Sequence, residues 1–157
     1  MKIELYSADG ELQQTIGITR RDFGEGEGYD YSIKNYKTGV EGFVEVMFKD
    51  LDWFEERAEP VFGSLLSVVS PDTDTIAEIT RFYPHKEPVR KRIPRSVTQK
   101  GIGSCALDTI LNDLKSQGFV NFYAHNPELR VYGMLLRRDF IELPTEDLDD
   151  HLFKQVS

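Results

Sequence analysis

The chain has 157 residues and a net charge of −8 at pH 7, with 39% hydrophobic and 29% charged residues. That length fits one domain with a substantial core. Its single cysteine excludes an internal disulfide framework, and no apolar run reaches the roughly 18 residues of a membrane span. Residues 1–5 lack the apolar stretch of a signal peptide, so we expect a cytoplasmic protein.

The first half of the chain has the alternating pattern and turn residues of β-hairpins. Strands are predicted over residues 2–7, 11–18, 29–37 and 40–48, and the glycine-rich acidic segment 24–28 forms a flexible connection between the hairpins.

A helix is predicted over residues 50–58, with Asp50 or Asp52 as its cap and Pro60 as its interruption. Residues 61–69 fit either a continuation of this helix or a buried strand, because periodicity alone does not separate the two.

The most informative segment is a glycine turn that leads into an amphipathic helix. A strand is predicted over residues 75–83, and the turn carries Gly101 and Gly103. The helix, over residues 103–114, has apolar residues at spacings of three and four: Ala106, Leu107, Ile110, Leu111 and Leu114. The free N–H groups at a helix start attract anions, and glycines let the backbone approach them closely. This arrangement predicts a ligand that carries phosphate.

Two phosphate-binding motifs do not fit the turn. In a P-loop the lysine follows the glycines, whereas Lys100 precedes them. A dinucleotide fingerprint requires a third glycine, and Ala106 occupies that position.

The succession of elements over residues 75–143 resembles the GCN5-related N-acetyltransferase family. Its acetyl-CoA motif is a strand, Arg/Gln-x-x-Gly-x-Gly/Ala and a helix. The elements that follow have the order that the resemblance implies: Gly118, a strand at 119–124, Asn126, a helix at 127–138 and a strand at 140–143.

The resemblance implies one α/β domain of the α+β type, with a mixed, largely antiparallel sheet flanked by helices. Within it, residues 1–70 form a divergent N-terminal half, 75–143 the CoA-binding half and 144–157 an acidic tail that we expect to be a short helix or a frayed end. The residues implied in binding acetyl-CoA are Phe82, Tyr83, Thr98, Gln99, Lys100, Gly101, Ile102, Gly103, Ser104 and Asn126.

The resemblance also implies Glu78 as general base and a tyrosine that protonates the leaving thiolate. Tyr132, about one helical turn before the family's tyrosine position, is the candidate for this acid. The alternatives are an exposed strand carboxylate for Glu78, a partly buried aromatic for Tyr132 and a helix cap for Asn126. His85 and His125 lack metal-ligand spacing and are expected at the solvent edge, so no metal is predicted.

The sequence departs from the family pattern at four places, one of which is a connection from Tyr83 to Thr98 that is longer than the family usually has. Thr98 occupies the Arg/Gln position of the motif, with Gln99 one place late. Family members often end in Tyr-x-x-x-Gly-Phe, but here Leu135 stands at the tyrosine and Asp139 at the glycine. The family also places two helices between its first two strands, where this sequence shows no clear pair.

Charge is unevenly distributed along the chain. Six basic residues against one glutamate give residues 84–100 a net charge of +5, which leaves −13 for the rest. This pattern suits a small polyanion such as CoA and disfavours nucleic acid. Together with the resemblance, this leads us to expect an N-acetyltransferase whose partners are acetyl-CoA and an unidentified amine. We expect no membrane partner, and the sequence is compatible with a homodimer. The alternatives are a non-catalytic acyl-CoA-binding or regulatory domain and a structural interaction module.

Overall fold

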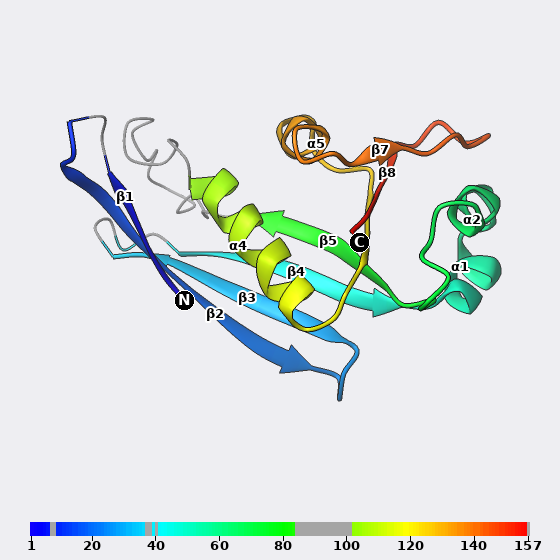
Figure 1. Cartoon of the computed structure of the whole chain (residues 1–157), viewed down its shortest axis with the longest axis horizontal. Coiled ribbons are helices and arrows are strands. Elements are labelled where there is room, and N and C mark those ends of the chain that lie inside the picture. The colour runs from blue at the N-terminus through cyan, green and yellow to red at the C-terminus, as the bar shows by residue number, and fades with distance from the viewer. Residues whose placement is uncertain (7–8, 37–38, 40, 84–101, 157) are drawn as a thin grey trace, which may run out of the picture.

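One eight-stranded sheet runs through the described part of the chain (Figure 1). The computed structural model describes residues 1–6, 9–36, 39, 41–83 and 102–156. The strands are β1 (Lys2–Tyr6), β2 (Leu12–Phe23), β3 (Gly28–Asn35), β4 (Glu41–Lys49), β5 (Ile76–Tyr83), β6 (Asn121–His125), β7 (Ile141–Glu142) and β8 (His151–Gln155). They lie in the order β1-β2-β3-β4-β5-β6-β8-β7, and among the strand pairs of the described residues only β5 and β6 are parallel. The expected α+β class with a mixed, largely antiparallel sheet is confirmed.

The first four strands form an antiparallel meander, as the hairpin signals predict. β2 is longer than expected and extends to Phe23. Residues 24–27 of the acidic segment form a tight turn before β3, in which Gly24, Glu25 and Gly26 have φ values of 59°, 53° and 94°. Glycine adopts such positive φ values without steric cost, which suits Gly24 and Gly26 to this turn.

Two short helices, α1 (Leu51–Arg57) and α2 (Glu59–Leu66), separate β4 from β5. Of the two predicted caps, Asp50 is the one used: its side chain accepts a hydrogen bond from the Trp53 amide at 2.8 Å. Pro60 lies in the first turn of α2, where the missing N–H costs nothing. Most of the ambiguous segment 61–69 is therefore helical. In the described residues the first helix pair follows β4 and does not lie between the first two strands.

The helices cover both faces of the sheet around β5 and β6. On one face α4 (Ile102–Ser116) and α5 (Leu129–Leu136) share a core with β2 to β6, whereas α1 and α2 pack on the other face with β5, β6 and β8. Asp113 anchors α4 to the meander, since its carboxylate accepts hydrogen bonds from Tyr31 at 2.7 Å and from Arg20 at 2.9 Å. No helix among the described residues has the length and apolarity to cross a membrane.

The expectation of a helix or a frayed end for residues 144–157 is wrong. Residues 151–155 form β8, which lies between β6 and β7. Leu152 and Phe153 are both fully buried, because one faces the α4 and α5 layer and the other the α1 and α2 layer. The acidic residues that suggested an exposed end belong to the loop before the strand.

Candidate active site

A cleft opens where the parallel strands β5 and β6 separate. They pair only at Ala77 with Phe122 and at Glu78 with Tyr123. Beyond this point the strands line a cleft, which we call the β5–β6 cleft, with the start of α5: Ile79, Thr80, Arg81, Phe82, Tyr83, Ala124, His125, Asn126, Pro127, Glu128 and Val131. Three residues implied in acetyl-CoA binding, Phe82, Tyr83 and Asn126, therefore meet at one place.

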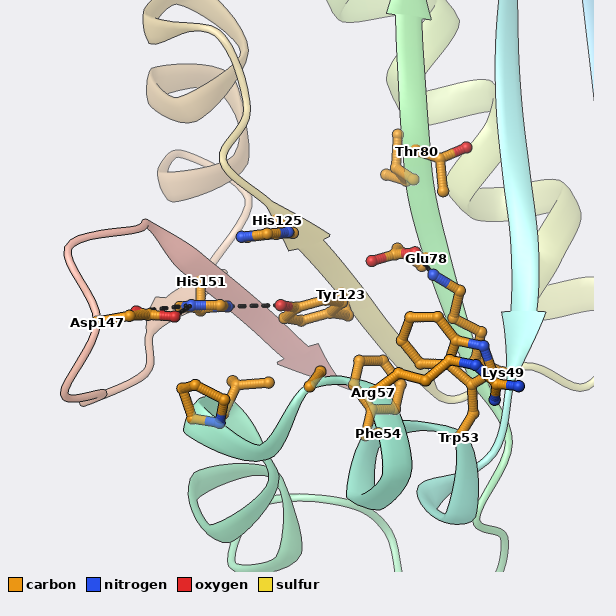
Figure 2. A pocket seen from close by; sticks show the side chains of 14 residues that line it. Lys49, Trp53, Phe54, Arg57, Glu78, Thr80, Tyr123, His125, Asp147 and His151 are labelled. Atoms are coloured by element: carbon orange, nitrogen blue, oxygen red, sulfur yellow. Dashed lines mark hydrogen bonds and ion pairs between the residues drawn. The ribbon is translucent and has the colours of Figure 1, made fainter.

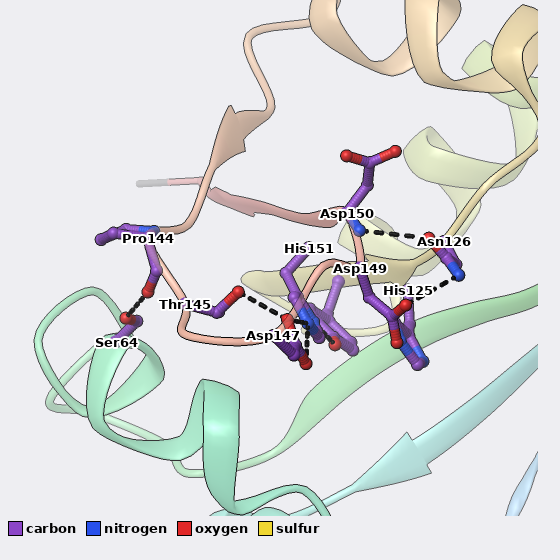
Figure 3. Close-up of polar contacts among 10 residues, drawn as sticks. Ser64, His125, Asn126, Pro144, Thr145, Asp147, Asp149, Asp150 and His151 are labelled. Carbon is purple, nitrogen blue, oxygen red and sulfur yellow. Dashed lines mark hydrogen bonds and ion pairs between the residues drawn. The ribbon is translucent and has the colours of Figure 1, made fainter.

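Asn126 holds the end of β6 in a left-handed conformation, with a φ of 52°. Its side-chain oxygen accepts a hydrogen bond from the Asp150 amide at 3.1 Å, and its backbone N–H donates to the Asp150 carbonyl at 2.7 Å (Figure 3). It does not cap α5, which starts at Leu129 after Glu128 and has no side-chain cap. The cap alternative for Asn126 is thus wrong.

The predicted anion-binding turn is described only in part. Ile102, Gly103 and Ser104 form the first turn of α4, and this turn contains no acidic residue. The Ser104 carbonyl accepts a hydrogen bond from Arg138 at 3.2 Å, which ties the turn to the end of α5. The expected ligands Thr98, Gln99, Lys100 and Gly101, together with the basic segment 84–100, lie outside the described residues.

A larger cavity of about 490 Å³ lies beside the cleft, on the side of the sheet covered by α1 and α2 (Figure 2). We call it the His151 cavity. Its walls come from α1, α2, β5, β6, the end of β4 and the loop before β8: Lys49, Trp53, Phe54, Arg57, Ala58, Pro60, Val61, Glu78, Ile79, Thr80, Tyr123, His125, Asp147 and His151. Ile79, Thr80 and His125 line both spaces, so the cavity and the cleft adjoin where β5 and β6 separate.

Glu78 lies in the wall of the His151 cavity and is 6% exposed. Its carboxylate forms an ion pair with Lys49, whose ammonium lies 3.7 Å from the centre of the Trp53 ring. An ammonium over an indole face is an attractive contact. The alternative that Glu78 is an exposed strand carboxylate is therefore wrong.

Next to Glu78 a chain of hydrogen bonds joins Tyr123, His151 and Asp147 (Figure 2). The Tyr123 hydroxyl lies 2.5 Å from His151 Nδ1, and His151 Nε2 lies 3.0 Å from both carboxylate oxygens of Asp147. A hydrogen bond from Thr145 and the contact with His151 lower the pKa of Asp147. Burial, together with the charge of Glu78, raises the pKa of Tyr123 well above that of an ordinary tyrosine.

The register of β8 brings this chain together. His151 pairs directly with His125, and Tyr123 lies two residues before His125 on the same face of β6. Side chains opposite and diagonal to one another in an antiparallel pair are within contact distance. The loop before β8 is held by Ser64, which donates a hydrogen bond to the Pro144 carbonyl, and by Thr145, which donates to Asp147 at 2.6 Å (Figure 3).

His125 stands at the junction of cleft and cavity. Its ring stacks on His151, with 4.7 Å between centroids, and its Nε2 lies 2.9 Å from Asp149. Among the described residues, the group that comes nearest to a metal site is His125, Asp149 and His151, because one ligand atom from each lies within 4.8 Å of the others. Both ring nitrogens of His151 are engaged by Tyr123 and Asp147, so a metal would have to displace one partner.

Tyr132 lines neither the cleft nor the cavity. It packs against the α4 side of the core, and partial burial together with the nearby Glu142 raises its pKa. Leu135, which occupies the tyrosine position of the family pattern, is fully buried. The structure thus does not bring Tyr132 into one site with Glu78.

Sequence reasoning missed most of the cavity. His125 is half exposed, as expected of a solvent-edge residue, but it also lines the site. His151 and Asp147 fall in the tail that was expected to be frayed, and Tyr123 reads as an ordinary core aromatic. The only available signal was the run His-Leu-Phe at residues 151–153, too short for a strand prediction. No protein-family model and no curated protein matches the chain.

Proposed function

We propose that the protein transfers an acetyl group from acetyl-CoA to an amine by direct attack. In this proposal the thioester arm lies in the β5–β6 cleft and the amine in the His151 cavity. The observation that carries it is the shared lining of the two spaces by Ile79, Thr80 and His125. Reactants that enter from the two sides would meet there, and proximity of this kind lowers the barrier of a two-substrate reaction.

The residues of the cavity supply what an amine acceptor needs. The cavity combines the carboxylates of Glu78 and Asp147, the cations of Lys49 and Arg57, and aromatic walls from Trp53 and Tyr123. In the proposed reaction the amine loses a proton as its nitrogen attacks the thioester carbonyl. The C–S bond breaks as the new C–N bond forms, and the thiolate takes up a proton that the amine nitrogen has released.

The phosphates of CoA would lie at the first turn of α4. This turn contains Gly103 and Ser104 and no acidic residue, and the basic segment 84–100 leads into it. Charge-assisted hydrogen bonds to phosphate are among the stronger ones in proteins. A cytoplasmic location belongs to the same proposal, because one cysteine leaves no internal disulfide that an oxidising compartment would preserve.

A thermal-shift titration with acetyl-CoA tests the binding step. A hundredfold excess over Kd stabilises the folded state by about 2.7 kcal/mol, roughly 5–11 °C for a chain of this size. Gly103→Val should abolish the shift, because a branched side chain would stand against the phosphates. Gly63→Val is the matched control, since Gly63 also lies in a helix and has open space around it. No shift with any CoA ester refutes the proposal.

The basic segment gives a second test of the same ligand. Reversing the charges of Arg90, Lys91 and Arg92 together should weaken CoA binding and flatten its salt dependence. Dephospho-CoA, which lacks the 3′-phosphate, should lose less affinity in that variant than CoA. Equal CoA affinities for the variant and the wild type at low salt would remove the segment from the binding site.

One observation favours a second function, an acyl-CoA-binding domain without catalysis. Tyr132, the expected acid for the thiolate, lies outside both spaces, and Leu135 is buried. Thiol release from acetyl-CoA against polyamines, aminoglycosides, amino acids and lysine peptides separates the two functions. Acetylation of any of these amines supports the enzyme, whereas tight binding of acetyl-CoA without acetylation supports the binding domain.

A further inference from the structure

The hydrogen-bonded chain of Asp147, His151 and Tyr123 has a defined direction. Asp147 is an acceptor when ionised, so the proton it binds must come from His151 Nε2. A neutral imidazole that donates from Nε2 accepts at Nδ1. With His151 neutral, the Tyr123 hydroxyl at 2.5 Å donates to Nδ1, and its own lone pairs are left for another donor.

We propose that Tyr123 takes the proton of the acceptor amine while it passes its own to His151, so that this chain is the base of the reaction. The inference rests on the proposed acetyl transfer and assigns its proton path. In the step, an amine N–H bond breaks and a bond to the Tyr123 oxygen forms. At the same time the Tyr123 O–H bond breaks and His151 Nδ1 is protonated, and Asp147 stabilises the resulting imidazolium.

The surroundings of Tyr123 explain why both transfers occur together. Tyr123 is 2% exposed, and its strand position pairs with that of Glu78, which is bound by Lys49. A free tyrosinate would be poorly solvated and repelled by Glu78. The raised pKa of Tyr123 agrees with this. The hydroxyl can thus relay a proton but does not store the negative charge.

Glu78 has a different role in this arrangement. Its carboxylate is already bound by the Lys49 ammonium, and it lies beside Tyr123. Its place beside Tyr123 lets it bind the amine at the Tyr123 hydroxyl, which makes it a binding residue of the cavity. Loss of its charge should weaken amine binding more than it slows the proton transfer.

Several charged or titratable groups face His151, and they set how it responds to pH. Asp147 and Tyr123 bind its two nitrogens, His125 stacks on its ring, and Asp149 pairs with His125. Across the cavity lie three further charged side chains, Lys49 on β4, Glu78 on β5 and Arg57 on α1. The proposed step needs His151 Nδ1 free to accept a proton, so activity should fall in acid, where an imidazole is protonated.

The test is the pH profile of kcat/KM for an accepted amine, measured on wild type, Tyr123→Phe, His151→Gln and Glu78→Gln. A lost general base costs about 10²–10⁴-fold. We expect losses of that order for Tyr123→Phe and His151→Gln, with the acid limb of the profile gone and the acetyl-CoA thermal shift unchanged. Glu78→Gln should keep the acid limb and mainly raise KM for the amine. Tyr36→Phe, an exposed tyrosine outside both spaces, is the matched control.

A wild-type rate and profile in Tyr123→Phe would overturn the inference and leave acetyl transfer standing. Absence of acetylation by the wild type would overturn both. The tautomer of His151 gives a test that needs no variant: long-range ¹H–¹⁵N NMR of the wild-type chain should show Nε2 protonated and Nδ1 bare. A proton on Nδ1 would overturn the proton path even in an active enzyme.

Discussion

The ion pair between Lys49 and Glu78 allows a sharp test of the cavity's electrostatics. Both side chains are close to fully buried, at 12% and 8% exposed, and Lys49 also stacks on Trp53. Lys49→Met keeps a long, flexible side chain beside the ring but removes the ammonium. The variant therefore leaves the Glu78 carboxylate in the cavity wall without its cation.

The expected loss can be estimated from these contacts. Removing one partner of a buried pair costs about 3–5 kcal/mol, and the residual exposure of both groups to the cavity places this case near 3 kcal/mol. The lost cation–π contact would add about 0.5–2 kcal/mol, which a methionine–aromatic contact largely replaces. A loss of about 3 kcal/mol corresponds to a fall in Tm of roughly 6–12 °C for a chain of this size.

Urea denaturation at pH 7 measures this loss, with the slope m as a check on two-state behaviour. The double variant Lys49→Met with Glu78→Gln should be more stable at pH 7 than Lys49→Met alone. A deficit below about 1 kcal/mol, or a double variant as unstable as the single one, would refute the reasoning.

Three further predictions concern other parts of the fold. The folded-state pKa of Asp147 is lowered, so its stabilising contribution is present at neutral pH and is lost as pH falls. The Tm difference between wild type and Asp147→Asn should therefore shrink below about pH 4, and a constant difference would contradict this. Burial and the hydrogen bond to Asp113 raise the pKa of Tyr31, so the stability of the wild type should decline above about pH 10. Tyr31→Phe should lose about 1 kcal/mol of stability at pH 7 and decline less above about pH 10, as chemical denaturation under the two conditions would show. Leu152→Ala should cost about 2–5 kcal/mol in urea titrations if β8 is a core strand, whereas a frayed tail would lose almost nothing.

Two segments of the chain, α4 and β5, have sequence patterns strong enough to identify them without tertiary information. The helix that begins at Ile102 has a 3.6-residue apolar repeat over four turns, and β5 is a continuous run of strand-forming residues. The hairpins before residue 50 are marked by alternation and by their turn residues. These signals depend only on neighbours in sequence, so most element positions follow from them, whereas the α+β class was what the family resemblance implied.

Tertiary pairing decided what local pattern could not. β8 is five residues long and follows an acidic loop, and it is stable as a strand because β6 and β7 satisfy its backbone hydrogen bonds on both sides. Its register sets His151 opposite His125 and within reach of Tyr123, although 26 residues separate the two histidines in sequence. The register cannot be predicted from residues 144–157 alone, because it depends on the strands that pair with them.

The sequence by itself thus determined the class of fold, the amphipathic helix after the glycine turn and the position of Glu78 on a strand. The tertiary structure decided that Glu78 is buried against Lys49, that Tyr132 faces away from the cavity and that the tail supplies His151 and Asp147. The physical reason is that periodicity and capping act within a few residues, whereas a site is assembled by sheet pairing between distant segments. The environment of each side chain in such a site is set by residues that are distant from it in the sequence.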